Sequence, residues 1–148
     1  SLLNVGDSAP MLTLKTLGGE TLNLSELKGK TVIVEFWATW CPPCLEEMQH
    51  LIAIHEKYAT RKDLVMIGIN RDHELGTVAE YLKSNPRIAW PQVFGEKGGV
   101  PKACDAFGVT GIPELFIIGP DGKIIDAHLR GGQIIQRVEA MMKDRPPG

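Results

Sequence analysis

Two cysteines, Cys41 and Cys44, stand three positions apart within Trp40-Cys41-Pro42-Pro43-Cys44. Thiols at this spacing can close a small disulfide ring and open it again, so they favour chemistry that transfers a pair of electrons. The apolar run that precedes them, residues 31–38, contains one carboxylate, Glu35, where a buried strand rarely carries a charge. These three side chains are the first candidates for a reactive site.

The position of Cys41 favours it as the attacking thiol. It stands where the strand gives way to a helix, and the unpaired N–H groups at a helix N-terminus stabilise a thiolate. Pro42 suits the first helical position because proline has no N–H to leave unpaired, and with Pro43 it helps to set the reduction potential. Cys44 follows about one turn later, so we expect it to resolve the mixed disulfide formed by Cys41.

A static disulfide and half of a zinc site are the alternatives for this pair. Zinc needs two further ligands, but there is no second Cys-x-x-Cys and no His-x-x-x-His. The histidines are scattered, at His50, His55, His73 and His128. We therefore expect no metal and no other cofactor, and we interpret Cys104 and His55 as packing residues.

Composition limits the classes of function. The chain has 148 residues, of which 43% are hydrophobic, and a formal net charge of −2 without long blocks of either sign. That balance argues against a nucleic-acid partner or a membrane-surface patch. We expect one domain over residues 1–148, with a core at 5–142 and a frayed tail at 143–148, and a monomer. Because the chain begins without Met, we expect a targeting or anchoring segment to have been trimmed.

Hydrophobic periodicity indicates alternating strands and helices that would position the thiols. The first half predicts a hairpin, a helical turn and then a βαβ unit, at residues 11–15 with 20–24, 25–29, and 31–38 with 42–59 and 64–69. In the second half, the pattern predicts a helix at residues 74–83, a weak strand at 90–94, a link at 95–99 and a helix at 100–107. It then predicts a hairpin around Asp121-Gly122, formed by residues 115–118 and 123–129, and a last helix at 134–142.

The residues from Val34 to Cys44, with Gly111-Ile112-Pro113 and the strand that follows, resemble the thioredoxin superfamily. The N-terminal hairpin, Cys-Pro-Pro-Cys-x-x-Glu and Phe-Ile-Ile-Gly-Pro-Asp-Gly-Lys are similar to the TlpA/ResA branch of bacterial thiol-disulfide oxidoreductases. The likeness covers residues 5–142. It implies a thioredoxin-like α/β fold: a central mixed β-sheet flanked by helices, with an N-terminal β-hairpin and an inserted helix at 74–83.

The resemblance also implies roles for two acids. Glu35 matches the buried acid of thioredoxin; burial would raise its pKa and let it exchange a proton with Cys44. Alternatively, Glu35 faces a solvated edge or satisfies a local polar group. Glu47 matches an active-site glutamate found in parts of the branch, although an acid in the first turns of a helix is also favourable to the helix dipole.

A substrate-binding surface follows from the same resemblance. Pro113 matches the cis-proline that faces the disulfide, which would leave the backbone of Ile112 free to pair with a substrate chain; a rigid trans turn is the alternative. Trp40 would form an apolar shelf beside Cys41. For Trp37, packing in the hydrophobic core is an equally good interpretation.

The leading hypothesis is a thiol-disulfide oxidoreductase that acts on protein dithiols or disulfides as a reductant, as many branch members do in cytochrome c maturation. The resemblance implies a periplasmic or extracytoplasmic location and a membrane thiol-reducing partner. A thiol peroxidase of the peroxiredoxin type is an alternative, but Thr39 stands two before Cys41 and no arginine is near. A copper chaperone is a second alternative, with His128 as the candidate ligand.

Overall fold

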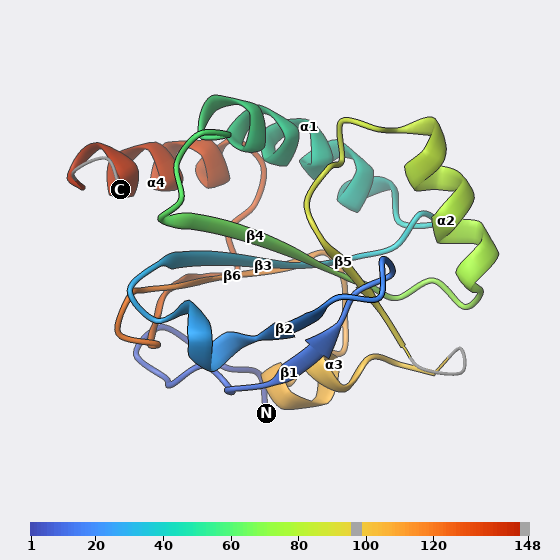
Figure 1. Ribbon diagram of the computed structural model, residues 1–148, viewed down its shortest axis with the longest axis horizontal. Coiled ribbons are helices and arrows are strands. Elements are labelled where there is room, and N and C mark those ends of the chain that lie inside the picture. The colour runs from blue at the N-terminus through green and yellow to red at the C-terminus, as the bar shows by residue number, and fades with distance from the viewer. Residues whose placement is uncertain (96–98, 146–148) are drawn as a thin grey trace.

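The computed structural model, which describes residues 1–95 and 99–145, is built on a five-stranded sheet in the order β5-β4-β3-β6-β7 (Figure 1). Its strands are β3 (Thr31–Trp37), β4 (Leu64–Asn70), β5 (Gln92–Phe94), β6 (Glu114–Ile118) and β7 (Ile124–Ala127). β3, β4 and β5 run parallel, whereas β6 is antiparallel to β3 and to β7. The predicted mixed sheet is confirmed.

Helices cover both faces of this sheet (Figure 1). One face lies under α1 (Pro42–Lys57) and α4 (Gly132–Lys143), and α2 (Leu75–Ser84) contributes Val78 to the same core. The other face carries α3 (Lys102–Phe107) and the N-terminal hairpin, formed by β1 (Thr13–Lys15) and β2 (Thr21–Asn23) and followed by the 3₁₀ turn η1 (Leu24–Leu27). The expected hairpin and inserted helix are therefore both present. No helix within the described residues has the length and apolar character needed to cross a bilayer.

The central strand β3 is buried along its whole length because both of its faces are covered. Ile33 and Trp37 point into the core beneath α1, whereas Phe36 points into the core beside α3. There the Phe36 ring meets Phe107 and Phe116 at centroid distances of 5.6 and 5.9 Å. Coverage on both sides explains why the sequence of this strand is a continuous apolar run rather than an alternating one.

The element types agree with the sequence predictions, and the differences lie at the ends. α3 begins after Pro101 rather than at Val100, and β7 ends before His128, whose φ of 62° leaves the extended region. α4 extends through Lys143, so the predicted tail is wrong at that residue. The link predicted over 95–99 and the tail predicted over 143–148 include residues 96–98 and 146–148, which lie outside the described residues.

Candidate active site

Cys41 and Cys44 are joined by a disulfide at the start of α1, with their Cα atoms 5.2 Å apart. Cys41 is the N-cap residue of the helix, and its sulfur accepts a hydrogen bond from the Cys44 N–H at 3.3 Å. Pro42 is the first helical residue, as its missing N–H favours, and Pro43 follows it on the exposed side. The helix N-terminus therefore directs partial positive charge at the Cys41 sulfur.

The loop before the disulfide is fixed by a buried carboxylate that the sequence analysis missed. Asp72, which follows β4, is 4% exposed and accepts hydrogen bonds from the Thr39 N–H at 3.0 Å and the Thr39 hydroxyl at 2.6 Å. The Asn70 side chain donates to the same carboxylate at 2.7 Å. Polar residues directly after a parallel strand were the available signal, because the carboxyl ends of β3 and β4 share one edge of the sheet.

An exposed aromatic surface lies beside Cys41. The Trp40 side chain is 55% exposed, and its ring stacks on His73 with the ring centroids 6.3 Å apart and the planes 11° apart. Trp37, by contrast, is 1% exposed and belongs to the core. Of the two tryptophans, Trp40 is therefore the one that a substrate chain can reach.

Pro113 immediately precedes β6, and the Ile112–Pro113 peptide bond is cis. β6 pairs with β3 so that Glu114 lies opposite Phe36. Pro113 is thus brought to the end of β3 from which the chain continues to the disulfide. Pro113 is buried, whereas Ile112 is only half-buried.

Glu35 is buried in the middle of β3, on the face that α1 covers. Its Oε1 accepts a hydrogen bond from the Trp90 indole N–H at 2.8 Å. Burial raises the pKa of this carboxyl to about 8, the Trp90 hydrogen bond opposes the rise, and the charge of Glu47 adds to it. The alternative that Glu35 faces a solvated edge is therefore wrong. The other alternative, that Glu35 satisfies a polar group, agrees with its hydrogen bond to Trp90.

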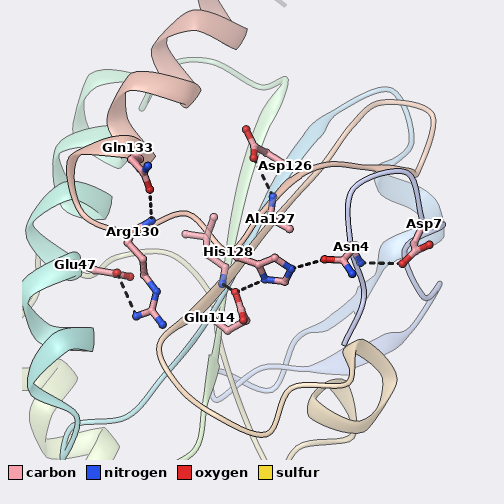
Figure 2. A network of polar contacts seen from close by, with 10 residues as sticks. Asn4, Asp7, Glu47, Glu114, Asp126, Ala127, His128, Arg130 and Gln133 are labelled. Carbon is pink, nitrogen blue, oxygen red and sulfur yellow. Dashed lines mark hydrogen bonds and ion pairs between the residues drawn. The ribbon is translucent and has the colours of Figure 1, made fainter. Parts of the chain in front are cut away.

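Glu47 is also buried, at 8% exposure, and does not lie on the solvated side of α1. Its carboxylate is 3.8 Å from the guanidinium of Arg130 and accepts a hydrogen bond from the Gly131 N–H at the start of α4. Burial raises the pKa of Glu47, and the Arg130 charge and the Gly131 N–H oppose that rise. Figure 2 shows the Glu47 side chain on α1 facing Arg130, which extends from the loop before α4.

His128 belongs to a polar network that reaches the chain N-terminus (Figure 2). Its Nδ1 is 2.9 Å from the Glu114 carboxylate, and its Nε2 is 2.7 Å from the Asn4 side-chain oxygen. Both ring nitrogens are therefore engaged, which leaves none for the copper ligation considered for this residue. Across residues 1–95 and 99–145, no three His, Cys, Asp or Glu side chains are grouped to hold a metal ion.

The third cysteine is remote from this chemistry. Cys104 is 1% exposed in the core beside α3, and burial raises the pKa of its thiol. His55 is half-buried with its ring 5.5 Å from that of Trp90. Both residues pack as the sequence interpretation expected.

The sequence and the fold are similar to those of known proteins over nearly the whole chain. The AhpC/TSA family matches residues 5–127. A thiol-disulfide oxidoreductase ResA of Halalkalibacterium halodurans is 33% identical over 143 residues, which are 97% of this chain and 78% of that protein.

Solved structures give the same result. The thioredoxin domain of a thiol-disulfide oxidoreductase from Bacteroides vulgatus superposes with a TM-score of 0.82 at 27% identity, covering 94% of this chain and 98% of that one. A thiol:disulfide interchange protein of the thioredoxin family from Chlorobium tepidum has a TM-score of 0.76 at 28% identity, covering 95% and 97%. These matches confirm the thioredoxin-like fold.

Proposed function

The chain belongs to the AhpC/TSA family and is a thioredoxin-like thiol-disulfide oxidoreductase, and from that premise we propose that it reduces disulfides in protein substrates through Cys41 and Cys44. The observation that carries this proposal is the Cys41–Cys44 disulfide at the N-terminus of α1. In the reduced form, the same N-terminus stabilises a thiolate on Cys41, the form that attacks a disulfide.

The reaction moves two electrons from the dithiol to the substrate. The Cys41 thiolate attacks one sulfur of the substrate disulfide, which forms a mixed disulfide and releases the other substrate sulfur as a thiolate. Cys44 then gives up its proton, and its thiolate attacks the sulfur of Cys41. The second substrate thiolate leaves, and the Cys41–Cys44 disulfide remains. An external dithiol must reduce it before the next cycle.

We propose that Glu35 accepts the proton that Cys44 gives up. A carboxyl group with a pKa of about 8 is close to the ordinary thiol value of about 8.5, so a proton can pass between the two at little cost in free energy. Burial beneath α1 supports this role. Glu47, which lies on α1 and acts on the Glu35 charge, is assigned a supporting electrostatic role.

We assign substrate binding to the surface around the disulfide. The exposed Trp40 ring offers apolar contact to an unfolded chain, and Pro42 and Pro43 expose the first turn of α1. The half-buried Ile112 next to Pro113 offers backbone groups for strand-like pairing. An extended protein segment is the substrate shape that suits this arrangement.

The finer assignments rest on the resemblance to the TlpA/ResA branch. We propose an extracytoplasmic location, a membrane protein as the source of electrons, and cytochrome c maturation as one setting for the reductase. The thiol-disulfide oxidoreductase ResA that is 33% identical to this chain supports the resemblance to that branch.

The direction of electron flow is tested by a glutathione redox titration of the Cys41–Cys44 pair. A potential near that of thioredoxin, about −270 mV, supports a reductant, whereas a potential near about −120 mV would mark an oxidant and contradict the proposal. Cys104→Ala is the matched control, because it removes a thiol without touching the pair.

The assignment of thiols is tested by activity. We expect Cys41→Ser to abolish reduction of a protein disulfide and Cys44→Ser to trap a mixed disulfide with the substrate. Retained activity in Cys41→Ser would sink the proposal. Peroxide consumption by the reduced protein that outpaces its reduction of disulfides would favour the thiol peroxidase instead.

A further inference from the structure

Three residues lie side by side across the sheet beneath α1. Glu35 on β3 pairs with Gly68 on β4, and Gly68 pairs with Gln92 on β5. Residues that pair directly across parallel strands point to the same face of the sheet. Glu35 and Gln92 are therefore separated only by a residue that has no side chain.

The carboxamide of Gln92 occupies the space above Gly68. A Cβ atom at that glycine would fall 2.1 Å from the Gln92 Oε1 and 2.5 Å from its Nε2, so only glycine leaves room for the amide. Gln92 is 5% exposed. Its Oε1 accepts a hydrogen bond from the Trp37 indole N–H at 2.8 Å, whereas its Nε2 is buried with no hydrogen-bond partner among the described residues.

Trp37 fixes which way this amide faces. An indole N–H can only donate, so the oxygen of Gln92 must be the atom toward Trp37. Trp37 comes after Glu35 on β3. Trp90 lies in the segment that leads into β5, whose first residue is Gln92. The amide lies over Gly68, the residue that separates Glu35 from Gln92, so its unpaired Nε2 is in the neighbourhood of a carboxyl group of which Trp90 occupies only one oxygen.

We propose that Gln92 is a positioning residue for proton transfer at Glu35: its Nε2 donates, through one buried water molecule, to the second carboxylate oxygen whenever Glu35 is ionised. The inference rests on the proposed role of Glu35. A buried water that joins otherwise unpaired polar groups is a regular feature of protein interiors. A donor to the charged form favours ionisation, so Gln92 holds the acid within reach of the Cys44 proton despite its burial.

The groups that face Glu35 from its neighbours are few. α1 contributes Glu47, whose charge raises the pKa of Glu35, and Cys44 of the same helix belongs to the core on this face of the sheet. The segment before β5 contributes Trp90, with His55 on the outer side of its ring. β6 contributes the apolar Leu115. Gln92 is therefore a donor that can be removed without adding or removing a charge.

The test is an NMR titration of the Glu35 carboxyl carbon in the oxidised protein, which needs no turnover. In Gln92→Met we expect the pKa of Glu35 to rise by about one pH unit or more, the worth of a hydrogen bond to a charged group. Gly68→Ala should produce the same rise by displacing the amide, and the double variant no more than either. Gly76→Ala, on α2 with open space around it, is the matched control and should leave the titration unchanged.

In the wild type, the Gln92 side-chain NH₂ resonances should follow the ionisation of Glu35, and in Glu35→Gln they should not titrate. An unchanged pKa of Glu35 in Gln92→Met overturns the inference, and this holds even where Gly68→Ala does not fold. These titrations are independent of catalysis. They can fail while Glu35→Gln still slows mixed-disulfide resolution. If instead the titrations give the expected shifts but Glu35→Gln leaves that resolution unchanged, the proposed role of Glu35 in proton transfer is refuted.

Discussion

At the scale of single residues, two buried acids near one disulfide have unlike surroundings. Glu35 is enclosed by apolar strands and receives one neutral hydrogen bond, from Trp90. Glu47 is also buried but has a cation, Arg130, and the Gly131 N–H beside it. Glu35 is therefore protonated in most molecules at neutral pH, because its pKa of about 8 lies above neutrality, and the ionised minority is the form that can accept the Cys44 proton.

The buried Glu35 makes stability depend on pH. Its pKa rises from 4.5 to about 8 on folding, so the folded state binds the proton more tightly; this contribution is full below pH 4.5 and is lost as the pH rises through 8. We expect the free energy of unfolding of the oxidised protein to fall across that range, by about 5 kcal/mol at most. Urea titrations at several pH values measure the fall.

Glu35→Gln is the comparison for that measurement. The glutamine can still accept from Trp90 but does not titrate, so its unfolding free energy should lack this fall. Parallel pH curves for the two proteins would contradict the raised pKa.

The same variant tests catalysis. Because Glu35→Gln cannot take a proton from Cys44, we expect resolution of the mixed disulfide to slow by about 10²-fold, the lower range for a general base. Rapid-quench measurement of substrate release follows this step. Glu139→Gln, an exposed acid on α4, is the control, and an unchanged resolution rate in Glu35→Gln would limit Glu35 to a structural role.

At this scale the sequence predicts more of the chemistry than of its surroundings. The spacing of Cys41 and Cys44 and the position of Glu35 inside an apolar run are local patterns, so the thiol pair and the burial of the acid could be predicted. The indole that bonds Glu35 belongs to Trp90, 55 residues away. No local pattern links the two, since only the pairing of β3, β4 and β5 brings them together.

At the scale of elements, the loop that leads into the disulfide is held in place by residues at the end of a neighbouring strand. Asp72 follows β4 and accepts both the backbone N–H and the hydroxyl of Thr39. The position of the two cysteines therefore depends on the pairing of β3 with β4 as well as on α1.

Removing this clamp should loosen the loop. In Asp72→Ala two half-buried donors of Thr39 lose their acceptor, and we expect a loss of about 1–3 kcal/mol in the free energy of unfolding. Amide hydrogen exchange at Thr39 and Trp40 should speed up, whereas exchange in α4 should change little. Asp105→Ala, an exposed acid on α3, is the control. Unchanged exchange at Thr39 would show that the loop is held by other contacts.

The ends of strands and helices are the part of the fold that local sequence patterns predict least well. β7 was expected to reach Leu129, but His128 leaves the extended conformation, where its ring joins Glu114 and Asn4. Asn4 is 124 residues away from His128. A long-range contact of this kind decides where a strand stops, and the residues around the stop do not report it.

At the scale of the whole molecule, the sheet separates two cores. The core beneath α1 includes the disulfide, whereas the core beside α3 contains Phe36, Phe107 and Phe116 together with the buried Cys104, which forms no disulfide among the described residues. The disulfide is in this way confined to one face, whereas buried apolar side chains on both faces contribute to stability.

This separation is testable with Phe107→Ala. The Phe107 side chain is 0% exposed, so we expect truncation to cost about 3–5 kcal/mol of stability. The redox midpoint of the Cys41–Cys44 pair should stay at its wild-type value in the folded protein. Calorimetry and the glutathione titration, run side by side, measure the two. A midpoint that moves by tens of millivolts would show that the faces are coupled.

The N-terminal segment touches both outer strands of the sheet. Near its start, Gly6 donates to Ile124, the first residue of β7, and Ala9 donates to Gly122 in the turn before that strand. Farther along, Leu17 donates to Gln92 on β5. Unpaired edge strands are templates on which foreign chains can assemble. A protein that acts on extended protein segments, as we propose for this one, meets such chains regularly. The segment fills part of each edge with the protein's own backbone, so an incoming chain has less edge on which to aggregate.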